Sequence, residues 1–144
     1  MTTGEFEKLG ETENTLYGPR FIISCGFTGE QKQFFMNLNE NTGVEFAPVV
    51  FPGPDNIDEP MENLLKLPHG DGIEKSIEYP PVVILSGLKE SELHQFMKRY
   101  REAAMPSPLF AVLTQFSEKW PFSYLVKHLV SEYKEMHEKR NRKE

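Results

Sequence analysis

Pro80-Pro81-Val82-Val83-Ile84-Leu85-Ser86-Gly87-Leu88 is the strongest structural signal in this 144-residue chain. Its apolar centre, largely β-branched, lies between a proline pair and a Ser-Gly turn signal, which predicts a strand buried on both faces. The next segment has the i, i+3, i+4, i+7 apolar spacing of an amphipathic helix, at Leu93, Phe96, Met97 and Tyr100. A buried strand that enters a helix through a glycine is half of a βαβ unit.

The first half of the chain contains a segment of the same form. The apolar run 21–27 predicts a second strand, and Thr28 with Gln31 has the capping-box spacing at the start of a helix expected over 30–41. A third strand is expected over 45–51, where Pro48 lacks an N–H and therefore favours a sheet edge. A fourth strand at 109–114 and a last helix from about residue 120 complete the pattern.

These two halves align with each other. Phe21–Met36 lies over Val82–Met97 at a constant offset of 61, which places Gly26 on Gly87. After a three-residue insertion around 105–108, the alignment continues with Phe46 on Phe110. We interpret this as a tandem duplication of one βαβα unit. A chance similarity between two ordinary strand–helix pairs is the alternative interpretation.

The predicted fold class is α/β, with two tandem βαβα repeats forming one mostly parallel four-stranded sheet flanked by helices. Right-handed crossovers in each half suggest the strand order 2-1-3-4. An antiparallel α+β arrangement is the alternative. We expect a single domain over 1–144, divided into a flexible arm (1–18), a first repeat (19–67), a linker (68–79), a second repeat (80–137) and a frayed tail (138–144).

Composition limits the possible classes of function. The formal net charge is −6 and the pI is about 5.3, which argues against a nucleic-acid partner. No apolar run approaches the roughly 20 residues that span a bilayer, so we expect no membrane partner and a cytoplasmic protein. The single cysteine, Cys25, excludes an internal disulfide and a cysteine-based zinc cage. We expect no metal and no cofactor.

The second half resembles a known family. The strand Val82–Gly87, the pair Glu92-Leu93, the run Phe110–Thr114 and Trp120 at the start of the last helix are its matching features. On these features, residues 80–137 resemble domain of unknown function 3783, an uncharacterised bacterial family. The resemblance implies a small α/β domain and no activity. This chain departs from the family at Pro121, where Thr or Ser is expected.

The two loops that follow the glycine-ended strands hold the candidate site residues. Ligands of open parallel sheets bind outside the carboxyl ends of strands, and helix N-termini there lower the pKa of a thiol. The candidate ligand-binding residues are Cys25, Gly26, Thr28, Ser86, Gly87 and Lys89, which would line one crevice. The structural alternative is two tight turns and a buried, inert cysteine. We expect no catalytic residue from the motifs.

Two hypotheses for function follow, because the sequence by itself leaves the function unknown. The first is a non-enzymatic soluble binding or regulatory module with a protein partner or a homodimer. The second is a small-molecule-binding protein or enzyme with a site at the strand ends near Cys25. An exposed, reactive thiol would favour the second hypothesis.

Overall fold

Four strands form one open sheet in the order β2-β1-β3-β4, which is the order expected from the sequence. The computed structural model describes residues 14–38 and 47–143. The strands are β1 (Phe21–Cys25), β2 (Val49–Val50), β3 (Val82–Ser86) and β4 (Leu109–Val112). The outer pairs β1·β2 and β3·β4 are parallel, whereas the central pair β1·β3 is antiparallel. The α/β class and the mostly parallel sheet are confirmed.

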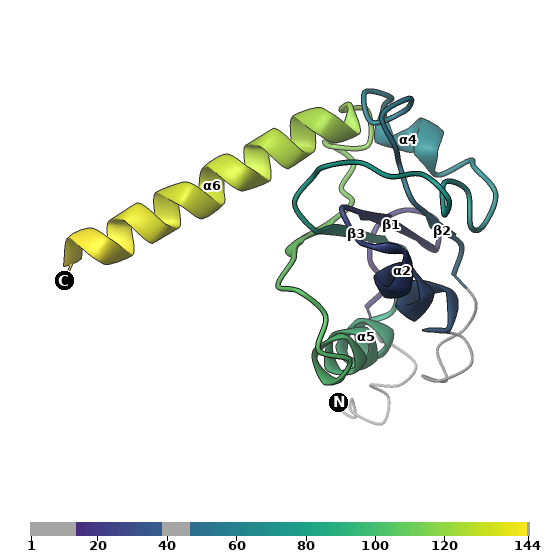
Figure 1. The fold of residues 1–144 in the computed structure, drawn as a ribbon, viewed down its shortest axis with the longest axis horizontal. Helices are drawn as coiled ribbons and strands as arrows, with labels where there is room; N and C mark the ends of the chain where they lie inside the picture. The colour runs from purple at the N-terminus through teal and green to yellow at the C-terminus, as the bar shows by residue number, and fades with distance from the viewer. Residues whose placement is uncertain (1–13, 39–46, 144) are drawn as a thin grey trace.

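Two helices cover each face of this sheet (Figure 1). Helices α2 (Gly29–Met36) and α5 (Glu90–Glu102) lie on one face, and α4 (Met61–Leu64) and α6 (Phe122–Lys143) lie on the other. The side chains of a strand alternate between its faces, so each strand contributes to both layers. Both central strands are buried along their whole length, as their apolar runs predicted.

Each layer has its own core. On the α2–α5 face, the buried strand residues Ile22, Val83 and Leu85 pack with Phe35 and Phe96. On the α4–α6 face, the core comprises Phe21, Ile23, Cys25, Val50, Met61, Leu64, Val82, Ile84, Leu113, Phe122, Leu125 and Val126. Phe35, Phe96 and Leu125 are buried, and Leu129 is partly buried against the α4–α6 core.

The expected three-residue insertion is wrong. Ile22 lies opposite Val49 in the first half, and Val83 lies opposite Phe110 in the second. Because Ile22 and Val83 differ by 61, this register matches Val49 to Phe110 at the same offset. The sequence alignment matched short apolar runs by residue type, whereas the register is set by hydrogen bonds between neighbouring strands.

The linker 68–79 covers the free edge of β2. The N–H of Gly70 donates to the carbonyl oxygen of Val49 at 2.7 Å, and the N–H of Phe51 donates to that of Asp71 at 2.8 Å. The N–H of Val49 donates to Nδ1 of His69 at 3.0 Å. These three bonds satisfy backbone groups that an edge strand otherwise presents to a partner.

Helix α6 extends well past the body of the protein (Figure 1). Its buried residues lie in the first turns, and it continues to Lys143. None of the helices in the described part of the chain combines the length with the apolar character that a membrane span requires. The expected features at 1–13, 39–46 and 144 lie outside the described residues.

Candidate functional site

The two candidate loops lie at opposite ends of the central strands β1 and β3. In the antiparallel pair β1·β3, Cys25 lies opposite Val82 and Ser86 lies opposite Phe21. The end of β1 is therefore beside the start of β3, and the end of β3 is beside the start of β1. The expectation of one crevice is wrong, because it required the carboxyl ends of both strands to meet. Cys25, Gly26 and Thr28 form one group, and Ser86, Gly87 and Lys89 form another.

Cys25 is a packing residue of the α4–α6 core. Its side chain is buried, and its Sγ lies 3.6 Å from the carbonyl oxygen of Pro52, to which the thiol donates. Burial raises the pKa of this thiol to about 12, against the smaller opposing effects of the Gly26 N–H and the Lys32 charge. The thiolate is the nucleophilic form of cysteine, so the thiol is held in its unreactive state at neutral pH.

The other residues of this loop shape the entry into α2. The Thr28 hydroxyl accepts from the Gln31 N–H at 3.2 Å, and the Gln31 side chain accepts from the Thr28 N–H at 2.8 Å. This is the capping box predicted from the sequence. Gly26 has a φ of +86°, and a Cβ there would lie 2.3 Å from the carbonyl oxygen of Pro80. Both residues therefore have local structural roles.

The second loop binds the segment that leads into β1. The Ser86 hydroxyl donates to the carbonyl oxygen of Pro19 at 2.6 Å, and the Gly87 N–H donates to that of Tyr17 at 3.1 Å. The Lys89 N–H donates to Oε1 of Glu92 at 2.9 Å. These polar groups of the loop are thus bonded within the chain.

An ion pair that the sequence did not indicate closes this end of the sheet. Nη1 of Arg20 lies 2.6 Å from Oε1 of Glu92, and both side chains are mostly buried. Burial by itself would raise the pKa of Glu92, but the bonds from Arg20 and from the Lys89 N–H outweigh it and lower the pKa. No local pattern could have found this pair, because its partners are far apart in sequence and meet only across the β1·β3 pair.

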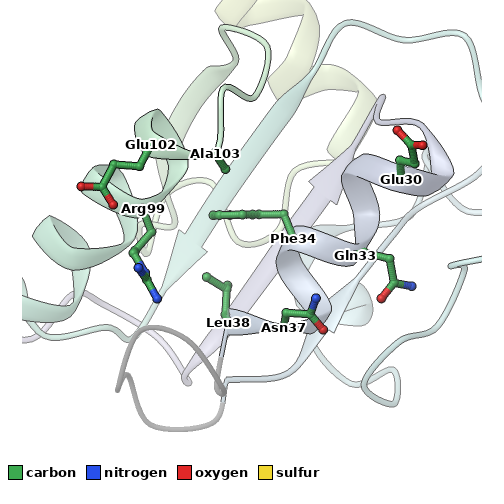
Figure 2. Close-up of a pocket in the computed structure, with 8 residues that line it drawn as sticks. All are labelled: Glu30, Gln33, Phe34, Asn37, Leu38, Arg99, Glu102 and Ala103. Carbon is green, nitrogen blue, oxygen red and sulfur yellow. The ribbon is translucent and has the colours of Figure 1, made fainter.

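A cleft of about 530 Å³ lies between α2 and the C-terminal part of α5. Figure 2 shows Phe34 and Leu38 directed between the two helices, while Glu30 and Glu102 point away. Phe34 also makes edge contacts with the rings of Phe35, Phe96 and Tyr100. The apolar floor therefore belongs to the α2–α5 core, and the polar side chains form an outer rim.

A second groove runs along β4 and differs from this cleft in its lining. We call it the β4 groove; it has a volume of about 390 Å³ and is lined by Leu85, Leu93, His94, Met97, Phe110, Ala111 and Val112. Its lining is almost entirely apolar, and His94 is its only titratable member among the described residues. Such a lining suits a hydrophobic partner better than a charged metabolite.

Comparison with family models identifies the segment that contains this groove. Residues 81–136 match the model described as Domain of unknown function (DUF3783). The resemblance predicted from the sequence is thereby confirmed for the second half of the chain. The DUF3783 segment includes β3, α5, β4 and the first part of α6. Searches of curated proteins and of solved structures found no match to the chain.

Within the DUF3783 segment, β4 is the exposed edge of the sheet. The N–H of Leu109 donates to the carbonyl oxygen of Pro81, and the N–H of Leu113 donates to that of Leu85, both at 2.9 Å. The backbone groups of Phe110 and Val112 therefore point outward. Among the described residues, no hydrogen-bond partner is found for these outward groups. The side chain of Val112 is 41% exposed, whereas every residue of β1 and β3 is buried.

The buried thiol leads to a direct prediction. Cys25 in the folded protein should react with iodoacetamide at least about tenfold more slowly than in the denatured chain at the same pH, since burial suppresses its thiolate. Mass spectrometry reports this one site cleanly, because Cys25 is the only cysteine. Faster reaction in the folded state would contradict the prediction and direct attention to a ligand site at this end of the sheet.

Proposed function

We propose that this chain is a non-enzymatic binding module that docks a polypeptide on the surface made by the outer edge of β4 and the β4 groove. One observation carries the proposal: β4 presents free backbone groups beside an apolar groove. An extended segment binds such an edge by backbone hydrogen bonds and fills adjacent pockets with alternate side chains. The Cys25 thiol and the Ser86 hydroxyl already form hydrogen bonds to carbonyl oxygens of the chain, which favours this hypothesis over a ligand site at the strand ends.

The other edge of the sheet supports this proposal by contrast. At β2, the outward groups of Val49 and Phe51 are bonded to the linker, and Nζ of Lys32 donates to the carbonyl oxygen of Ile73 at 3.0 Å. The chain therefore already places a segment of its own, folded as consecutive turns, along one edge. At the offset of 61, Lys32 corresponds to Leu93 in the β4 groove, which replaces a charged donor with an apolar side chain.

We also propose that the two halves are tandem repeats of one βαβα unit. The β1·β3 register supports this, because Ile23 lies opposite Ile84, the residue that corresponds to it at the offset of 61. Pro60 forms an isolated bridge with Pro121, again at that offset. Under this proposal, β2 with its linker and β4 with its open edge are equivalent. The β4 surface is then the position that the linker fills in the first half.

A display experiment tests the proposed function. The native protein, immobilised at low density so that copies stay apart, should select peptides from a random phage-displayed library. These peptides should lose binding to a Val112→Lys variant, because a lysine places a charge in the apolar groove at an exposed position. The control is Gln33→Lys, which adds the same charge on α2 at an exposed site. Failure to enrich peptides, or equal binding to Val112→Lys, would overturn the proposal.

A further inference from the structure

We infer that the polypeptide docked on this surface is a second copy of the same chain, joined through an antiparallel β4·β4 pair into one eight-stranded sheet. The inference rests on the proposed function, because it names the occupant of the β4 surface. Three features of the described residues lead to it: an uncharged lining, the placement of the outward backbone groups, and the direction of α6.

The lining of the β4 groove can pack against the same groove of a second copy. Each copy has a formal net charge of −6, so a contact between copies must avoid the acidic parts of the surface. Among the described residues that line the groove, the imidazole of His94 is the only acidic or basic side chain. Two such surfaces related by a two-fold axis present apolar side chains to each other, as a self-complementary interface requires.

The outward backbone groups of β4 are placed symmetrically about Ala111. A two-fold axis at Ala111 puts Phe110 of one copy opposite Val112 of the other. Each N–H of these residues then meets a carbonyl oxygen, which gives four hydrogen bonds across the axis. The two Ala111 residues form the intervening non-hydrogen-bonded pair, with Cα atoms roughly 4.5 Å apart. This pairing satisfies the four outward groups of Phe110 and Val112 in each copy.

The side chains of β4 also match this arrangement. Phe110, Ala111 and Val112 line the β4 groove. Leu109 and Ala111 also pack against the α4–α6 core, where they are only partly buried. In the pair, Val112 of each copy packs beside Phe110 of the other, and the two grooves become continuous. The partly exposed sides of Leu109 and Ala111 remain available to a second contact.

Helix α6 supplies that second contact. Figure 1 shows the strand labels β2, β1 and β3 from right to left, and α6 runs on to the left, toward the β4 side and beyond the body. Val126, Leu129, Tyr133 and Met136 follow one another at alternating spacings of three and four, so they form one stripe. Val126 is buried in the core, while Tyr133 and Met136 are 54% and 63% exposed.

Helix α6 is long enough to extend over the strands of the second copy. Residues 131–143 extend for roughly 20 Å at the rise of an α-helix, which is about the width of four neighbouring strands. In the dimer, each α6 lies across the α6 side of the other copy's β4, and Tyr133 and Met136 cover Leu109 and Ala111 there. A stable interface needs roughly 800 Å² per partner, more than one short strand pair offers, and the two helices supply the remainder.

Sedimentation velocity of the full chain from about 1 to about 200 µM tests the inference. The native chain is expected to be a dimer over most of this range. Val112→Lys should weaken the dimer more than about 100-fold, because it places two ammonium groups in the apolar contact. Met136→Lys should weaken it by about tenfold or more through the helix contact. Gln33→Lys, on α2, should leave the dimer unchanged. Circular dichroism checks that each variant is folded.

A cross-link tests the position of the two-fold axis. Ala111→Cys in a Cys25→Ala background should form an intermolecular disulfide under mild oxidation, since non-hydrogen-bonded pairs bring Cβ atoms within disulfide reach. A Gln33→Cys variant in the same background should stay monomeric on a non-reducing gel.

Three results would overturn the inference. A native chain that is monomeric throughout the concentration range would exclude a second copy as the occupant. A dimer that Val112→Lys does not weaken, or an Ala111→Cys dimer that does not cross-link, would exclude the β4·β4 pair. The peptide selection at low density is independent of these results. Peptides that bind β4 while the chain is monomeric would leave the proposed function standing without its dimer.

Discussion

Replacing Phe96 with alanine is expected to lower the free energy of unfolding by about 3–5 kcal/mol. The Phe96 side chain is 2% exposed, and its ring centroid lies 6.2 Å from that of Phe35 and 6.1 Å from that of Phe110. It therefore joins α5 to α2 and to β4 at once, and its removal leaves a cavity that the rigid sheet beneath cannot fill. Urea denaturation followed by circular dichroism measures the loss.

His94 provides the matched control on the same helix. It is exposed, so His94→Ala should change the free energy of unfolding by less than about 0.5 kcal/mol. A loss below roughly 1 kcal/mol for Phe96→Ala would mean that this face of α5 is not packed on the sheet. Such a result would also remove the basis for the β4 groove, which Leu93 and Met97 of the same helix line.

A Gly26→Ala substitution is expected to destabilise the fold by roughly 2–5 kcal/mol. Gly26 has a φ of +86°, which side chains disfavour, and the added Cβ would lie 2.3 Å from the carbonyl oxygen of Pro80. The backbone must shift, because this neighbour is a main-chain atom just before a buried strand. The loss is measured by urea denaturation, with unchanged slope as evidence that the unfolded state is unaffected.

Two further glycines provide comparisons for this prediction, one without strain and one with a similar strain. Gly29 begins α2 with no atom within 4 Å of an added Cβ, so Gly29→Ala should be neutral or stabilising by up to about 1 kcal/mol. Gly87 has a φ of +71°, and a Cβ there would lie 2.5 Å from the main chain of Pro19. Gly87→Ala should therefore destabilise the fold about as much as Gly26→Ala. A cost below about 1 kcal/mol for Gly26→Ala would show that this turn relaxes easily.

Local patterns were enough to locate the main elements. The apolar runs before Gly26 and Gly87 are short, β-branched and closed by turn signals, and both are buried strands. The helix after the second run has its predicted apolar face inward, with Phe96 and Tyr100 buried. Each of these features depends on residues within one or two turns of each other, so the sequence contains all the information they need.

The pairing of strands that are distant in the sequence was harder to predict from the sequence. The sequence alignment introduced an insertion before β4, and the observed register of Phe110 against Val83 removes it. Apolar residues recur in every strand, so a shift of a few residues still matches apolar to apolar. Only the hydrogen bonds of the parallel ladder distinguish these alternatives.

The sequence therefore predicted the α/β class, suggested the strand order and located the two loops that follow the central strands. The opposite directions of β1 and β3 became evident only in the folded chain, and they separate Cys25 from Ser86, so that the two residues share no crevice. A strand buried on both faces has the same apolar pattern in either direction, so its direction follows from packing of the halves rather than from local sequence. The same packing leaves β4 as the open edge and directs α6 past it.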